Sequence, residues 1–294
     1  MDYLIYLFYK FLELLLRFLP HFVSKQIFSF LAYLAYLLDS KHNKIAKTNL
    51  DLAFGSSLTP KRKDEIIKNS YKNLFFDLFE FVENQYLSKD ELIKKVKTEN
   101  EEYLTDALKA NKKIILITAH YGNWEIISPF VGLKYNKEMV QVGKKLSNKY
   151  LDLDMVKIRS SNNCTMLYKK EAAKGLIKSL RANKILGLAV DQNIAHKKGT
   201  IVEFFGLKST QTDSPSRLAK KFDAVIIPVF SILNDFRDYT IKFGKPIDIN
   251  RENLTIDEAT QLQSDAIEKQ IKEYPDIWFW QHKRWKEYYK DRYK

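Results

Sequence analysis

The residues best suited to chemistry lie in one short stretch, His120-Tyr-Gly-Asn-Trp-Glu125. His120 directly follows the apolar run 113–118, and a helix is predicted to begin within the stretch. In open α/β sheets, such a strand-to-helix turn faces the crevice at the carboxyl ends of the strands. A carboxylate in the first helical turn can hold one ring nitrogen while the other accepts a proton from an attacking hydroxyl. The spacing therefore indicates His120 as a general base that Glu125 orients.

No serine or cysteine in the sequence accompanies this pair as a nucleophile, so it favours direct attack by a substrate hydroxyl on an acyl donor. A structural interpretation stays open, in which His120 caps the helix and pairs with Glu125. His282 and Glu287 repeat the spacing, but within HKRWKEYYK, where an exposed polar helix face is predicted. Cys164, the single cysteine, precedes a short strand in an Asn-rich turn, which gives a Cys–His hydrolase no support.

The elements that would position these residues alternate between short apolar runs and helical stretches. The runs are apolar on both faces, which is typical of a largely parallel sheet covered by helices. Strands are predicted over 113–118, 138–142, 185–190 and 225–232, with helices near 122–133, 148–160, 171–182 and 215–222. Further helices are predicted over 40–54, 60–86 and 256–273, with a short one from Ser88. The fold class is α/β, with a helical N-terminal layer before one α/β domain.

The N-terminal layer is unusually apolar. Residues 3–19 hold 14 apolar or aromatic residues, and their three charges, Lys10, Glu13 and Arg17, share one helical stripe. This pattern predicts membrane association, either as a helix lying in the interface or as one spanning with its charged stripe against protein. A second run, 22–38, is either a second span or a helix packed under the globular domain, and we favour packing. A soluble protein with a buried N-terminal hairpin is the alternative.

The charge pattern bears on location and partners. The chain has 49 Lys+Arg against 36 Asp+Glu, a net charge of +13, which favours anionic partners such as nucleic acid, an acidic bilayer, a phosphorylated substrate or an acidic carrier protein. The lysines are spread throughout rather than gathered with aromatics, so nucleic-acid binding is not favoured. Basic residues after the apolar runs place the main body in the cytoplasm. We expect an N-terminal membrane layer over 1–39 and a cytoplasmic domain over 40–294.

Six blocks of the sequence, in the same order, resemble those of the bacterial lipid A biosynthesis acyltransferases, the late or secondary acyltransferase family. AHYGNWE resembles the H-x4-D/E block of membrane acyltransferases, in the H-x-G-N-W-E form of that family. The other blocks are Lys44–Phe54, Asn148–Arg159, Asp191-Gln192 followed by Gly199–Gly206, Pro215–Ala219 followed by Ile227-Pro228, and Pro275–Lys286. The resemblance covers most of the chain and implies an acyltransferase-type α/β fold.

The resemblance also implies the reaction. A fatty acyl chain would pass from acyl carrier protein to a hydroxyl of a lipid A precursor at the cytoplasmic face of the bacterial inner membrane, with no metal or other cofactor. His120 would be the base and Glu125 its orienting partner. Arg159 would act towards phosphate, phosphopantetheine or a developing oxyanion, and Asp191 would hold Arg159 or the following loop.

An ordinary salt bridge is the alternative for Arg159 and Asp191, and Asn123 is a further expected substrate-binding residue. The rival enzyme is an acyl-CoA-dependent glycerolipid or glycolipid acyltransferase with the same chemistry.

Overall fold

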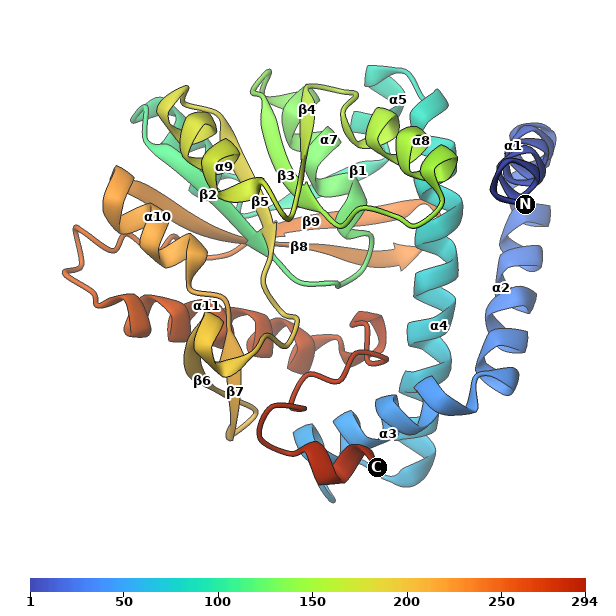
Figure 1. Cartoon of the computed structure of the whole chain (residues 1–294). Coiled ribbons are helices and arrows are strands. Elements are labelled where there is room, and N and C mark those ends of the chain that lie inside the picture. The colour runs from blue at the N-terminus through green and yellow to red at the C-terminus, as the bar shows by residue number, and fades with distance from the viewer.

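A seven-stranded sheet forms the centre of the computed structural model, which describes residues 1–294 (Figure 1). Its strand order is β1-β9-β8-β2-β5-β3-β4. Only the β8–β9 pair is antiparallel, so the predicted α/β class with a mostly parallel sheet is confirmed. The strands are β1 (Val96–Glu99), β2 (Lys113–Thr118), β3 (Met139–Gly143), β4 (Cys164–Tyr168), β5 (Ile185–Ala189), β8 (Ala224–Asp235) and β9 (Asp238–Phe243).

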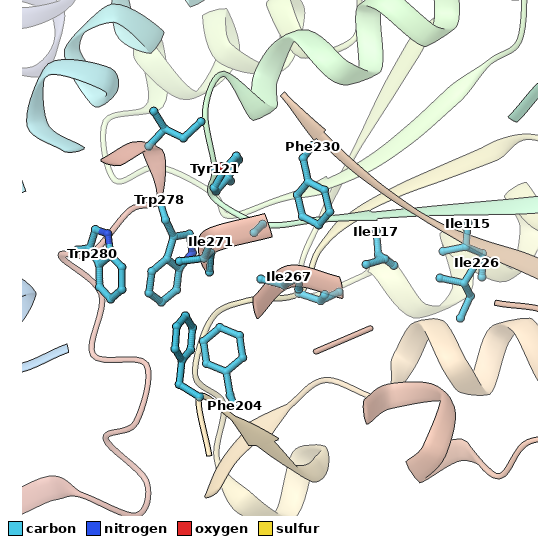
Figure 2. Packing of buried hydrophobic residues seen from close by; sticks show 14 of the residues in the cluster. Ile115, Ile117, Tyr121, Phe204, Ile226, Phe230, Ile267, Ile271, Trp278 and Trp280 are labelled. Carbon is cyan, nitrogen blue, oxygen red and sulfur yellow. The ribbon is translucent and has the colours of Figure 1, made fainter. Parts of the chain in front are cut away.

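Helices cover both faces of this sheet because its central strands are apolar on both sides. In β2, Ile114 and Leu116 belong to one buried cluster, whereas Ile115 and Ile117 belong to the other, which Figure 2 shows in part. The first cluster is closed by α5 (Lys89–Lys94), α6 (Glu102–Lys109) and α7 (Trp124–Lys134). The second is closed by α9 (Ala172–Arg181), α10 (Ser214–Phe222) and α11 (Ile256–Glu273). The remaining helix of this region is α8 (Lys149–Arg159).

The N-terminal helices form a layer around the long helix α4 (Pro60–Glu83) (Figure 1), and they contribute residues to the second buried cluster. Helix α2 (His21–Leu38) runs beside α4, and the rings of Phe28 and Phe79 meet with centroids 5.2 Å apart. The packing predicted for residues 22–38 is therefore confirmed. Helix α3 (Ser40–Phe54) links α2 to α4.

Helix α1 (Asp2–Phe18) turns its charged stripe towards the protein and its apolar side chains outwards. Glu13 is 2% exposed and accepts hydrogen bonds from Lys10 and the Tyr86 hydroxyl. The Arg17 guanidinium lies 4.0 Å from the centre of the Tyr86 ring. The charged stripe of α1 therefore lies against the rest of the protein. No helix of the structure has both the length and the apolar character needed to cross a bilayer.

The C-terminal segment corrects another expectation, because 275–294 is a largely irregular, partly buried chain and not an exposed polar helix. Trp278, Trp280, Trp285 and Arg284 are at most 1% exposed. Figure 2 shows Trp278 and Trp280 lying near Phe204, at the end of the hairpin formed by β6 (Thr200–Phe204) and β7 (Leu207–Gln211). Arg284 donates to the carbonyl of Thr210 and the side chain of Gln211. Burial of the indole rings explains the irregular course of this segment.

Candidate active site

Two neighbouring strands bring His120 and Asp191 together. β2 and β5 are parallel partners, with Thr118 opposite Ala189 at their carboxyl ends. His120 and Asp191 each follow two residues later, so they leave the sheet at the same edge and the same level. This is the edge where open α/β sheets place their sites, as predicted for His120.

The Asp191 carboxylate holds His120 by both its ring and its backbone. Nδ1 of His120 lies 2.8 Å from Oδ1 of Asp191, and the backbone N–H of His120 donates to Oδ2 at 3.0 Å. The indole N–H of Trp278 donates to the same Oδ2 at 2.9 Å. The His120 side chain is 24% exposed and that of Asp191 only 4%. The histidine therefore keeps access to solvent while the carboxylate is enclosed.

This arrangement sets the charge of both groups. Burial acts to lower the pKa of His120, but the Asp191 carboxylate outweighs it and raises that pKa above its ordinary value of 6.5. Burial acts to raise the pKa of Asp191, yet the nearby imidazole and the Trp278 and backbone donors hold it far below its ordinary range. Asp191 is therefore ionised, and neutral His120 directs its Nδ1 proton to it, which leaves Nε2 free to accept a proton.

Glu125 does not make the expected hydrogen bond to His120. It lies in the first turn of α7 and forms a two-point ion pair with Arg159 at the end of α8, where Nε donates to Oε2 at 3.0 Å and Nη2 donates to Oε1. The expectation that Glu125 orients the ring is therefore wrong in this structure. The reason is topological, because the adjacent strand already places Asp191 at Nδ1. Glu125 still adds negative potential near the histidine, which favours its charged form.

Arg159 and Asn123 also have partners different from those expected. Arg159 forms a salt bridge with Glu125 and makes no ion pair with Asp191, so the first of the two roles expected for Asp191, holding Arg159, is wrong. Asn123 is fully buried, and its Oδ1 accepts the backbone N–H of Ile126 at the start of α7. Its position is that of a helix cap, with no exposed surface for a substrate.

The turn between His120 and Asn123 is clamped from two sides. The backbone N–H of Gly122 donates to the Ile277 carbonyl at 2.9 Å, and that of Phe279 donates to the His120 carbonyl at 3.0 Å. A Cβ added to Gly122, whose φ is +51°, would lie 1.7 Å from the carbonyl oxygen of Ser231 in β8. Only glycine fits a turn that approaches β8 this closely. The clamp fixes the backbone from which the His120 side chain projects.

Three residues at the site, Gln192, Trp278 and His282, were not predicted as site residues from the sequence. The side-chain amide nitrogen of Gln192 lies 3.3 Å from Nε2 of His120, on the solvent-exposed side of the ring. Trp278 holds Asp191, and His282 accepts the backbone N–H of Asn193 at 2.9 Å. Burial lowers the pKa of His282 to about 4, so it is a neutral acceptor that supports the loop after Asp191. Trp278 and His282 lie in the block Pro275–Lys286, which resembles the family. Nothing in the sequence indicated that this block contacts Asp191 and the loop after it.

A cavity of about 400 Å³, including its open mouth, adjoins the Glu125–Arg159 pair. The two charged residues lie in its wall together with Phe81, Gln141 and Cys164. Burial raises the pKa of the Cys164 thiol to about 12, so this thiol is protonated and a poor nucleophile. No three His, Cys, Asp or Glu side chains are grouped as metal ligands. Arg159 is the only cationic side chain that lines the cavity, so it is the positive group that a ligand there would meet.

Comparison with known proteins agrees with this site. The model of the bacterial lipid A biosynthesis acyltransferase family matches residues 1–287. A lipid A biosynthesis acyltransferase of Haemophilus influenzae is 27% identical over 82% of this chain and 76% of its own length.

Two relatives from Escherichia coli carry more specific names. A lipid A biosynthesis palmitoleoyltransferase is 20% identical over 84% of this chain and 79% of its own length. A lipid A biosynthesis lauroyltransferase is 22% identical over 91% of this chain and 87% of its own length. With a family match that spans almost the whole sequence, the chain belongs to the bacterial lipid A biosynthesis acyltransferases and is an acyltransferase enzyme.

Proposed function

We propose that this enzyme transfers a fatty acyl chain from acyl carrier protein to a hydroxyl of a lipid A precursor, with His120 as general base and Asp191 as its orienting carboxylate. The observation that carries the mechanism is the 2.8 Å contact between Nδ1 of His120 and the buried Asp191, which leaves Nε2 on the exposed side. Family membership supports the reaction class. The proposal keeps the predicted base and changes its partner from Glu125 to Asp191.

The reaction follows from this geometry. Nε2 of His120 accepts the proton of the acceptor hydroxyl while the oxygen attacks the thioester carbonyl carbon. The C–O bond forms, the carbonyl becomes an oxyanion, and the imidazolium is stabilised by Asp191. Collapse of this intermediate breaks the C–S bond, and His120 returns the proton to the thiolate that leaves. The products are an ester and a free thiol, with no change of oxidation state.

Arg159 supplies a positive charge near this step, and Gln192 supplies a neutral hydrogen-bond donor. The amide of Gln192 lies beside Nε2 and can donate to the oxyanion or to the entering hydroxyl. Arg159, fixed by its two-point pair with Glu125, borders the adjoining cavity and suits a phosphate or phosphopantetheine group of a substrate. In this proposal Glu125 is a positioning residue that acts through Arg159.

The apolar surface of α1 and α2 supports a place at the cytoplasmic face of the bacterial inner membrane. Phe8, Phe18, Phe22, Phe30 and Leu38 are each at least 60% exposed, an unusually large apolar area for a soluble surface. Because the charged stripe of α1 is already paired with protein, its outward face is free to enter the lipid interface. An anionic phospholipid surface and an acidic carrier protein are both complementary to the net charge of +13.

The test is mass spectrometry of the product formed by the detergent-purified protein from acyl carrier protein carrying mixed chain lengths and a tetra-acylated lipid A precursor. We expect a product that carries one additional acyl group. His120→Ala and Asp191→Asn should each reduce the rate of its formation by roughly 10²-fold or more. His196→Ala, which changes an exposed histidine, is the matched control and should retain activity.

Activity that survives in both site variants would overturn the proposed base. A mass gain only with acyl-CoA and a glycerolipid or glycolipid acceptor would identify the rival acyltransferase instead. The masses obtained would also name the acyl chain.

A further inference from the structure

A second hollow, distinct from the cavity beside Arg159, lies between α3 and the C-terminal segment. It encloses about 310 Å³, including its open mouth. Its lining consists of Lys41, Lys44, Ile45, Thr48, Lys283 and Tyr293. None of these residues makes a hydrogen bond or an ion pair with His120 or Asp191, so the hollow is not part of the proposed base.

The hollow gathers three positive charges and no negative one. None of Lys41, Lys44 and Lys283 forms a salt bridge, although the structure contains many such pairs elsewhere. The Lys283 ammonium lies 5.6 Å from the centre of the Tyr293 ring. No carboxylate lines the wall. Like charges that share a concave surface repel one another and raise the local potential, so an anion bound there would be stabilised by all three.

The two hydroxyl groups in the wall already donate their protons to other protein atoms, so only the lysines can donate hydrogen bonds to a ligand. The Tyr293 hydroxyl donates to the buried Oδ1 of Asn49, and the Thr48 hydroxyl donates to the Lys44 carbonyl at 2.9 Å. Both hydroxyl protons are therefore used within the protein. Three mobile ammonium groups suit a phosphate, which is compact and carries several acceptor oxygens, better than a planar carboxylate that favours a guanidinium.

The position of the hollow indicates how the phosphate would be presented. Leu37 and Leu38, 54% and 80% exposed, end the apolar surface of α2, and Lys41 follows three residues later in α3. Apolar side chains directly beside lysines match the order of layers at a lipid interface, where acyl chains give way to headgroup phosphates. A phosphate carried on a lipid could thus reach the lysines while its chains meet α2.

We infer that the Lys41–Lys44–Lys283 hollow is a binding site for the phosphate group of a lipid. The phosphate can belong to an anionic phospholipid of the bilayer or to a phosphorylated glycolipid acceptor. The inference rests on the proposed place of the enzyme at a membrane surface, but it does not depend on the chemistry at His120. In addition to the apolar contact of α1 and α2 with lipid, the protein would then have a site that selects for lipids with an anionic phosphate.

The test compares wild-type protein with the triple variant Lys41→Gln/Lys44→Gln/Lys283→Gln in vesicle flotation. The control, Lys174→Gln/Lys178→Gln/Lys208→Gln, removes the same charge from exposed positions on α9 and β7. Vesicles contain phosphatidylcholine alone, phosphatidylcholine with phosphatidylglycerol, or phosphatidylcholine with a phosphorylated tetra-acyl disaccharide lipid. All six lysines are at least partly exposed, so all proteins should keep the wild-type Tm.

We expect the hollow variant to lose about 100-fold of its affinity for vesicles with an added anionic phosphate lipid. Its affinity for phosphatidylcholine alone should stay unchanged, because the choline group neutralises the phosphate of that lipid. The control should lose less than about fivefold. Loss with both phosphate lipids supports a general lipid phosphate site, and loss with the disaccharide lipid alone assigns the site to the acceptor.

Equal losses in the two variants, or no loss in the hollow variant, would overturn the inference and leave the proposed reaction intact. Failure of wild-type protein to bind phosphatidylcholine would instead contradict the membrane contact of α1 and α2. In that case, selective binding of the phosphate lipids through the hollow would still support the phosphate site.

Discussion

At the scale of single residues, the proposed reaction depends on the contact between the His120 imidazole and the Asp191 carboxylate. His120 was predicted from its place after strand 113–118, and the structure puts it at the expected edge. The spacing to Glu125 suggested a pair that the structure replaces with His120–Asp191 and Glu125–Arg159. Spacing reports neighbours along a helix, whereas the partner of His120 comes from a strand 71 residues away. That adjacency depends on strand order, which the sequence alone did not reveal.

The dependence of activity on pH tests the His120–Asp191 pair. The base must be neutral, so kcat/KM should fall as the pH decreases through the pKa of His120, which Asp191 raises above 6.5. Asp191→Asn removes this charge and should move the acid limb to lower pH, while lowering the plateau through loss of orientation. Steady-state profiles of both proteins give the two midpoints. An acid limb that stays in place in Asp191→Asn would contradict the pairing.

Gly122→Ala tests the clamp on the His120 turn. The new Cβ would lie 1.7 Å from the Ser231 carbonyl oxygen, so the turn must shift and the His120 ring must move with it. We expect a loss of at least about 3 kcal/mol in the free energy of unfolding, together with loss of activity. The control is Gly206→Ala, which has φ +71° but nothing within 4 Å of the new Cβ and should cost about 1–2 kcal/mol. Urea unfolding measures the free energy of unfolding of both variants. Equal losses would show that the close approach to Ser231 does not explain the need for glycine at position 122.

At the scale of elements, the apolar periodicity predicted the central strands and most helices. Strand 113–118 and helix 256–273 have the predicted bounds, because buried apolar runs and a capping box mark them clearly. β1, β9 and the β6–β7 hairpin were not predicted. β1 is a four-residue edge strand of sequence VKTE, and β6, of sequence TIVEF, alternates buried and exposed residues on a small satellite sheet. Such strands lack the continuous apolar run that identifies a buried one.

The outward face of α1 makes a prediction at this scale. The triple variant Phe8→Ser/Phe11→Ser/Phe18→Ser changes side chains that are 55–78% exposed, so its Tm should stay close to that of wild type. Its affinity for phosphatidylcholine vesicles should fall by roughly 100-fold or more, because three aromatic side chains no longer enter the interface. Flotation measures this. Leu153→Ser/Ile201→Ser/Leu262→Ser, at exposed positions on α8, β6 and α11, should bind like wild type.

At the scale of the whole molecule, the N-terminal layer and the C-terminal segment are joined beneath the site. Asn49 of α3 is fully buried, and its amide donates to the carbonyls of Trp280 and His282, each at 2.6 Å. The same segment carries Trp278, which holds Asp191. The block Lys44–Phe54 was identified only by its resemblance to the family. The structure gives it a physical role, because its Asn49 anchors the C-terminal segment. Long-range contacts of this kind have no signature in local periodicity.

Asn49→Ala tests this connection. Two donated hydrogen bonds and one accepted from Tyr293 are lost in a buried region, so we expect a decrease of about 3 kcal/mol in the free energy of unfolding. Activity per folded molecule should also fall, because the segment that positions Trp278 loses its anchor. Asn69→Ala, which removes one exposed hydrogen bond to Asp276, should cost less than about 1 kcal/mol. A variant at Asn49 with full stability would show that the joint is not needed.

The order of these parts along the chain has a consequence for biosynthesis. All nine strands precede Trp278, so a nascent chain can complete its sheet and bring His120 beside Asp191 before the indole donor has left the ribosome. At that stage the carboxylate lacks one of its three donors, and the turn at Gly122 lacks the carbonyl of Ile277. The growing polypeptide would therefore carry an unsupported histidine. Full acyl-transfer competence would arise only when the tryptophan-rich segment leaves the ribosome and folds over the finished sheet.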